Sequence, residues 1–100
     1  MKKTILRNKD VIRVLMGTPI NHQHIRTIIE TASEQYVFQE ATIANIVRAY
    51  ISLKTHPNLS GIELLQKTLQ DRKIGYAKSQ LVESPKDSED VISELNSLFD

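Results

Sequence analysis

The feature that most constrains the fold is one short run of strand-forming residues near the N-terminus. Residues 11–16 read Val-Ile-Arg-Val-Leu-Met, and Gly17-Thr18-Pro19 follows them. A run rich in β-branched residues that ends at glycine and proline is typical of a strand followed by a turn. A single strand exposes unpaired backbone groups on both edges and is not stable by itself. The predicted strand must therefore pair with another strand.

Most of the remaining sequence predicts helices. Apolar residues recur at intervals of three and four, beginning with Ile25 and Ile28, which is the spacing of an amphipathic helix. His56-Pro57 ends one helix, because the residue before a proline disfavours helical geometry. Ser60 and Glu63 form a capping-box pattern that begins the next helix. The predicted helices cover about residues 19–35, 41–54, 60–75, 76–82 and 89–100, and residues 84–88 are a predicted linker.

The pairing partner of the predicted strand decides the fold. Because the rest of the chain predicts helices, the natural partner is the same strand of a second copy, paired antiparallel about a twofold axis. Two such strands backed by four helices form a ribbon–helix–helix dimer. The predicted fold class is therefore mainly α, with one short N-terminal strand per chain followed by C-terminal helices.

The outward face of such a ribbon is a candidate DNA-binding surface, because a two-stranded ribbon fits the major groove of B-DNA. Alternation along the strand turns Ile12, Val14 and Met16 toward the helices, and Arg13 and Leu15 outward. Arg13 is the candidate for a guanine contact. Leu15 is the candidate for contact with a thymine methyl group.

Basic residues near the N-terminus supply candidate contacts to the DNA backbone. Residues 1–13 carry five basic residues and one acidic residue. Such contacts set affinity and its salt dependence but not sequence choice. A hydroxyl at the start of the helix predicted over 41–54 adds a phosphate contact at the positive end of the helix dipole. The candidate phosphate-binding residues are Lys2, Lys3, Arg7, Lys9 and Thr42.

The C-terminal segment has the opposite charge and a separate candidate role. Residues 81–100 carry six acidic residues and one basic residue. After the linker, apolar residues recur at helical spacing. A helix that docks in a groove of a partner uses this spacing, and so does a helix that packs on its own domain, so both alternatives stay open. The candidate partner-binding residues are Val91, Ile92, Leu95, Leu98 and Phe99.

The order of the predicted elements is also informative. A short strand, two helices, an Xaa-Pro break and a leucine-rich helix follow one another. The residues that carry this pattern are Ile12–Met16, Ala44–Lys54 in the second helix, His56-Pro57 and Ile62–Leu65. Over about residues 10–70 this order resembles the ParR/StbB-type plasmid segregation adaptors. The resemblance implies ribbon–helix–helix dimers on repeated centromere sites and a mobile C-terminal segment that contacts an actin-like motor filament. Ser88–Asp100 matches that segment in its acidic, amphipathic character and its position.

These features together predict a sequence-specific protein that binds double-stranded DNA as a homodimer or higher assembly. The most specific function is a plasmid partition adaptor that links repeated DNA sites to an actin-like filament. The expected regions are 1–57 for DNA binding and dimerisation, 58–83 for a helical cap, and 84–100 for the linker and the partner-binding segment.

Two alternatives use the same sequence differently. Residues 41–84 could form a helix-turn-helix transcriptional repressor, in which residues 78–80 read bases while Arg72 and Lys73 bind phosphate. The second alternative is a small helical protein-binding module of the immunity or anti-factor type, without DNA binding. The near-zero net charge of +1 and the apolar C-terminal segment favour this second alternative.

The sequence lacks the residues that several kinds of functional site require. The chain has no cysteine, which excludes disulfides and thiolate zinc sites. His22 and His24 point to different sides of a helix, and no acidic residue completes a metal site with them. No glycine-rich phosphate loop is present. We therefore expect no cofactor, no metal and no enzymatic activity. Without a membrane-length apolar run or a signal-peptide pattern, we expect a cytoplasmic protein with no membrane contact.

Overall fold

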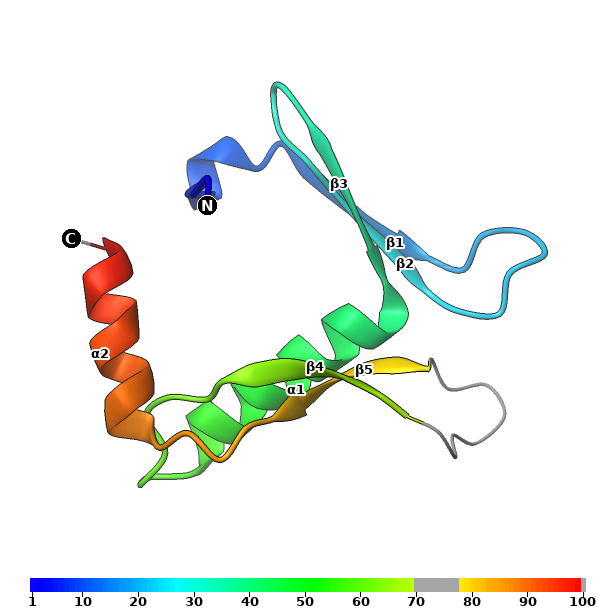
Figure 1. Cartoon of the computed structure of the whole chain (residues 1–100). Helices are drawn as coiled ribbons and strands as arrows, with labels where there is room; N and C mark the ends of the chain where they lie inside the picture. Colours follow the sequence, from blue (N-terminus) through cyan, green and yellow to red (C-terminus); the bar gives the residue numbers. More distant parts are fainter. Residues whose placement is uncertain (70–77, 100) are drawn as a thin grey trace. The chain divides into compact units, whose positions relative to one another are not determined.

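The computed structural model describes residues 1–69 and 78–99 and shows a small α+β fold (Figure 1). The described residues form five strands in two antiparallel sheets, two α-helices and one 3-10 helix, Asn8–Asp10. The prediction of a mainly helical ribbon–helix–helix dimer is therefore wrong, because the first strand pairs within its own chain. The chain divides into two compact units, Met1–Ile43 and Ala44–Asp100.

The N-terminal unit contains a three-stranded antiparallel sheet. Its strands are β1 (Arg13–Gly17), β2 (Arg26–Glu30) and β3 (Gln35–Gln39), with β2 in the centre (Figure 1). β1 confirms the strand predicted over residues 11–16, with bounds displaced by one or two residues. The partner that this strand requires is β2, so the backbone groups along one of its edges are satisfied inside the chain.

Both faces of this sheet carry apolar side chains. Paired residues lie on the same face, and successive residues of a strand lie on opposite faces. An antiparallel sheet with one buried face shows apolar residues on one face only. One face carries the paired row Leu15, Ile28 and Val37, and the other carries the rows Val14, Ile29, Tyr36 and Met16, Thr27, Phe38.

β2 occupies the segment that the sequence predicts as a helix over residues 19–35, so that prediction is wrong. Ile28 and Ile29 fit the spacing of a helix, but their β-branched side chains favour a strand once neighbouring strands supply backbone partners. The backbone N–H of Thr31 donates to the carbonyl oxygen of Glu34 at 2.9 Å. This bond closes the turn that leads into β3.

The C-terminal unit combines a long helix, a pair of antiparallel strands and a terminal helix (Figure 1). Its elements are α1 (Glu40–Thr55), which begins in the N-terminal unit, β4 (Leu64–Thr68), β5 (Ser79–Glu83) and α2 (Ser88–Phe99). α1 and α2 confirm the second and the last of the predicted helices to within one residue at each described end. Asp100 lies outside the described residues.

The two helices predicted between residues 60 and 82 are wrong where the structure describes the chain, because β4 and β5 lie there. Residues 70–77 of these predicted helices lie outside the described residues. The capping-box pair of Ser60 and Glu63 begins no helix. Glu63 Oε2 instead accepts a hydrogen bond from Lys86 Nζ at 3.3 Å, a contact made between residues far apart in the sequence.

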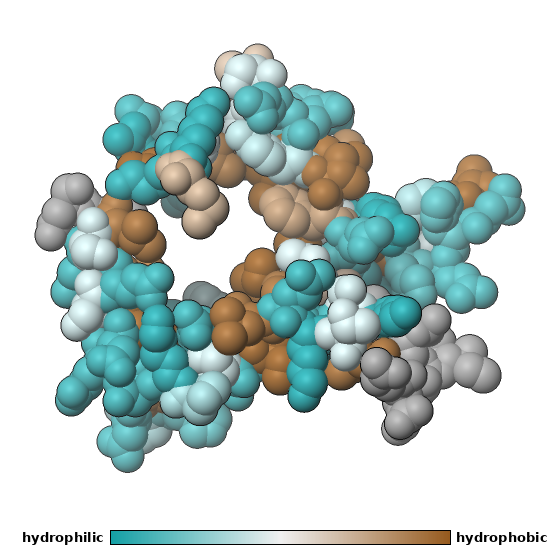
Figure 2. All heavy atoms as spheres, viewed as in Figure 1, coloured by the Kyte–Doolittle hydropathy of each residue, from teal (hydrophilic) through white to brown (hydrophobic). Residues whose placement is uncertain are grey.

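The apolar core is small. Among the described hydrophobic residues Val91 alone is buried, at 7% exposed, and hydrophobic residues, brown in Figure 2, reach the surface. The chain exposes 8540 Å². Two separate compact bodies with this combined mass are expected to expose about 7,000 Å². The chain therefore exposes about 1,500 Å² more surface than two compact bodies of its mass.

Candidate interaction surface

α1 packs on its own unit through a small and polar face. Asn45 is 8% exposed, and its Nδ2 donates to Oε1 of Gln80 in β5 at 3.0 Å. Ala49 and Ser52 follow at four and seven positions, so they lie on the same face, and both are half-buried. A buried amide needs a hydrogen-bond partner, and the contact with Gln80 supplies one.

The opposite side of α1 is apolar and exposed. Five of its side chains are between 36% and 59% exposed, and we call them the α1 stripe: Ile46, Val47, Tyr50, Ile51 and Leu53. At 100° per residue these positions cover an arc centred roughly opposite Asn45. The helix predicted over 41–54 has this same apolar pattern, but in the structure the pattern faces away from β4 and β5.

An amphipathic helix normally turns its apolar side toward the core of its domain. Within its own unit α1 instead buries its polar face and exposes its apolar face. The α1 stripe is therefore available to another apolar surface. Contiguous exposed apolar patches on small proteins mark interaction sites. Full burial of a large aliphatic or aromatic side chain contributes about 1.5–3 kcal/mol. Covering five half-exposed side chains therefore contributes roughly 5 kcal/mol as an upper estimate.

The N-terminus of α1 already holds a carboxylate. Glu40 Oε1 accepts a hydrogen bond from the backbone N–H of Ile25 at 3.1 Å, and Oε2 lies 3.2 Å from Nδ1 of His24. The bond from Ile25 lowers the pKa of Glu40, and His24 lowers it further. Thr42, predicted to bind phosphate, lies half-buried in this first turn. A phosphate bound there would meet the negative charge of Glu40.

The candidate base-reading residues lie on β1. Arg13 and Leu15 share one face of the strand, as the alternation predicts, and both are exposed. The Arg13 Nε lies 3.2 Å from Oε1 of Glu30, and Gln35 Nε2 donates to Oε2 of the same carboxylate at 2.7 Å. The bond from Gln35, followed by that from Arg13, lowers the pKa of Glu30. Arg13 would have to leave this ion pair to reach a base.

The candidate phosphate-binding residues of the N-terminal arm precede β1 and are exposed: Lys2, Lys3, Arg7 and Lys9. The backbone N–H of Arg7 donates to Oδ2 of Asp10 at 3.0 Å, which fixes the short 3-10 helix at the end of the arm. Four basic side chains thus lie within the first nine residues, beside the one carboxylate of Asp10.

The candidate partner-binding residues of α2 do not form one exposed face. Val91 is buried against Gly61, and Ile92 is half-buried. Leu95 and Leu98 are exposed at 42% and 49%. The side chain of Phe99 lies outside the described residues. The N-terminal half of the predicted stripe therefore packs on its own unit, which is one of the two alternatives that the sequence leaves open for the segment.

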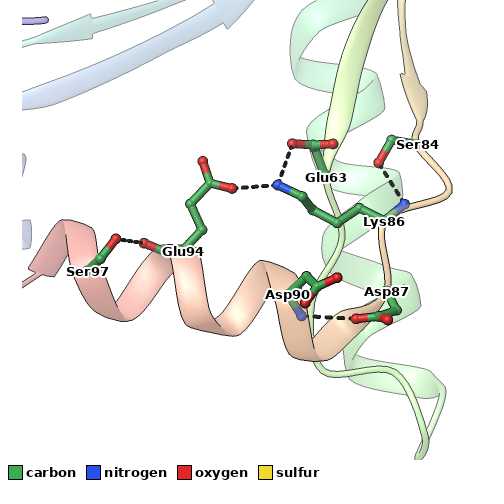
Figure 3. Close-up of polar contacts among 7 residues, drawn as sticks. All are labelled: Glu63, Ser84, Lys86, Asp87, Asp90, Glu94 and Ser97. Carbon is green, nitrogen blue, oxygen red and sulfur yellow. Dashed lines mark hydrogen bonds and ion pairs between the residues drawn. The ribbon is translucent and has the colours of Figure 1, made fainter.

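A polar cluster holds the start of α2 against the strand pair (Figure 3). Lys86 Nζ lies 3.3 Å from Oε2 of Glu63 and 2.6 Å from Oε2 of Glu94. The bond to Glu94, followed by that to Glu63, raises the pKa of Lys86. Ser84 and then Lys86 lower the pKa of Glu63. All these groups are at the surface, where ion pairs contribute modestly, so the cluster orients α2 more than it stabilises the fold.

The backbone at the start of α2 is capped by a neighbouring side chain (Figure 3). Asp87 Oδ1 accepts a hydrogen bond from the backbone N–H of Asp90 at 3.0 Å. A carboxylate in this place satisfies a helix N–H and interacts favourably with the helix dipole. Asp87, in the predicted linker, thus has a structural role at the first turn of α2.

No family model matches the chain, and neither a curated protein nor a solved structure is similar to it. Within the described residues no three histidine, aspartate or glutamate side chains are grouped so that they could hold a metal ion. The helices in the described part of the chain are too short and too polar to cross a membrane.

The apolar pattern of α1 is visible in the sequence, but its exposure is not. Sequence reasoning assigns the stripe to a core because an apolar helical face normally packs inward. One signal for the opposite orientation is Asn45, since with Ala49 and Ser52 it forms a second, small-residue face that also suits packing. In the structure the buried face is the one with Asn45, which donates to Gln80 of β5.

Proposed function

We propose that this protein is a non-enzymatic, cytoplasmic protein-interaction module that docks through the α1 stripe. The observation that supports the proposal is the reversed orientation of α1, whose polar face with Asn45 is buried while its apolar face is exposed. The proposal keeps the protein-binding part of the second alternative from the sequence. It replaces that alternative's helical fold with the α+β fold.

A stripe that serves docking must be dispensable for folding of the free chain. The test replaces Ile46 or Ile51 by glutamine, which has the higher helix propensity and cannot make an apolar interface. Urea unfolding is measured below micromolar protein concentration, so that association adds nothing to stability. We expect Ile46→Gln and Ile51→Gln to change the free energy of unfolding by at most about 1 kcal/mol, because both side chains are half-exposed.

The matched control is Val91→Gln, the same kind of change at the buried hydrophobic position. We expect this variant to lose at least about 2 kcal/mol, because it deletes apolar packing and buries an amide. A loss of about 2 kcal/mol or more in the two α1 variants would show that the stripe is packed inside the chain, and the proposal would be wrong.

DNA binding is the second candidate function, and the exposed basic arm supports it. Contacts from Lys2, Lys3, Arg7 and Lys9 would go to phosphates and would depend strongly on salt. The specific role of a partition adaptor needs a ribbon made by two chains, and β1 pairs with β2 of its own chain. We therefore propose backbone binding by the arm without the ribbon and without a base-reading role for Arg13.

The salt dependence of binding to a mixed-sequence duplex tests this candidate. Replacing the four basic residues of the arm by glutamine should weaken binding at low salt and flatten the slope of log K against log salt. The expected change in slope is about 0.9 for each phosphate that the arm no longer neutralises. Lys67→Gln, on β4, is the control and should leave the slope nearly unchanged. Equal slopes for the wild-type chain and the arm variant would rule out the arm as a DNA-binding element.

A further inference from the structure

We propose that the N-terminal arm, residues 1–9, binds the surface of a membrane that carries anionic lipids. The inference goes beyond the proposed function, because it uses a surface other than the α1 stripe. The arm is also the element that the DNA-binding candidate uses. A bilayer surface takes up apolar side chains as well as positive charge, and this second property distinguishes it from a DNA backbone.

The arm carries positive charge and no acidic residue. Its basic side chains are all exposed: Lys2, Lys3, Arg7 and Lys9. Asp10 follows the arm, and its Oδ2 accepts a hydrogen bond from the backbone N–H of Arg7 at 3.0 Å. Each lysine or arginine near an anionic lipid surface strengthens binding about fivefold. The arm is therefore complementary in charge to such a surface.

Two large aliphatic side chains lie between these charges. Ile5 is 48% exposed and Leu6 is 43% exposed. Phosphate contacts on a duplex use the basic side chains alone, so DNA binding leaves these two side chains without a role. The boundary between headgroups and acyl chains buries aliphatic side chains beside basic ones. Burying the exposed half of each side chain strengthens binding about fivefold.

The arm combines the two signals that peripheral membrane binding requires. Basic residues or a short apolar segment alone give weak, reversible binding, and the two together give a stable contact. The expectation of no membrane contact from the sequence rests on the lack of a membrane-length apolar run. A peripheral contact does not need such a run, so the exposed aliphatic residues of the arm replace that expectation.

The test is co-sedimentation of the full chain with lipid vesicles. Vesicles of phosphatidylcholine with about 30% phosphatidylglycerol are compared with phosphatidylcholine alone, at about 50 and 500 mM salt. We expect binding to the anionic vesicles at low salt and little binding in the other three conditions. Replacing the four basic residues of the arm by glutamine should weaken the binding by more than about 100-fold.

The decisive variant combines Ile5→Gln with Leu6→Gln. It removes the apolar signal, keeps every charge and changes no helix or strand. We expect it to weaken binding to anionic vesicles about 20-fold. The matched control combines Leu65→Gln with Val82→Gln, which replaces an aliphatic pair on β4 and β5 that is 53% and 39% exposed. The control should bind the vesicles like the wild-type chain.

Three results would overturn the inference. The first is a wild-type chain that does not bind anionic vesicles. The second is an Ile5→Gln, Leu6→Gln variant that binds them as tightly as the wild-type chain. The third is an equal loss of binding in that variant and in the control. If the arm binds a mixed-sequence duplex but not the vesicles, the DNA-binding candidate stands without this inference.

The proposed function can fail or stand independently of this inference. The urea test of the α1 stripe changes Ile46 and Ile51, whereas the vesicle test changes only the arm and its control pair. Vesicle binding that depends on Ile5 and Leu6 supports the inference, whichever result the α1 variants give.

Discussion

Adding one methyl group at Gly61 should displace α2. A Cβ at this position would lie 2.9 Å from both Cβ and Cγ1 of Val91 and 3.2 Å from the carbonyl oxygen of Ser88. The first two distances are shorter than any relaxed carbon contact. Gly61 does not have a left-handed backbone, so alanine there is unfavourable because of crowding and not because of its φ angle.

The expected loss in the free energy of unfolding depends on the contacts that the added methyl group would displace. Val91 is the buried hydrophobic residue of the described chain, and Ser88 Oγ links the two segments through the N–H of Ser60 and the carbonyl of Gly61. Overpacking of this kind costs about 1–3 kcal/mol. We expect Gly61→Ala to lower the free energy of unfolding by that amount in urea, followed by far-ultraviolet circular dichroism.

Gly17→Ala is the matched control, because no atom lies within 4 Å of its added Cβ. It should be neutral or stabilise by up to about 1 kcal/mol, since alanine reduces the freedom of the unfolded chain. Combining Gly61→Ala with Val91→Ala should recover part of the loss, with a coupling energy of at least about 0.5 kcal/mol. A loss below about 0.5 kcal/mol for Gly61→Ala alone would refute the packing of α2 on this segment.

Two further predictions concern polar groups. Thr27 is 4% exposed, and its Oγ1 has no hydrogen-bond partner. Thr27→Val should therefore raise the free energy of unfolding by about 1 kcal/mol, whereas Thr27→Ser should not. Equal stability of the two variants in urea would contradict this prediction. Ser84 and Lys86 lower the pKa of Glu63, so its contribution to stability is present above its ordinary pKa and is lost as pH falls through the lowered value. Acid unfolding of Glu63→Gln should therefore depend less on pH than that of the wild-type chain, and identical acid profiles would exclude this role.

Elements with strong local signals could be predicted from the sequence. β1 follows from β-branched residues that end at Gly17-Thr18-Pro19, and α2 from acidic residues at its start with apolar residues at helical spacing. Both signals lie within the segment itself. The structure places a strand and a helix there, respectively.

β2 and β4 could not be predicted because their stability depends on partners distant in the sequence. Ile28 and Ile29 satisfy the spacing of a helix as well as that of a strand. The choice is decided by pairing with Leu15 and Val14 on β1, and by the ion pair between Arg13 and Glu30. The sequence pattern within one segment does not show which distant segment it will pair with.

The candidate site could be predicted only in part. The apolar residues of α1 form one face of a helix in the sequence pattern, but the pattern alone assigns such a face to a core. The contact from Asn45 to Gln80 of β5, 35 positions later, fixes the opposite orientation. The C-terminal pattern predicts a partner-binding stripe, yet Val91 is held by Gly61 of its own unit.

The most direct test of the docking surface is a photo-cross-link from the centre of the α1 stripe. Tyr50, 59% exposed, is replaced by p-benzoylphenylalanine, and the pure protein is irradiated at about 100 μM. We expect no link from position 50 to another segment of the same chain, because the stripe serves a separate partner. A product that stays monomeric, with position 50 linked to another segment of the same chain, would show that the stripe belongs to the protein's own core.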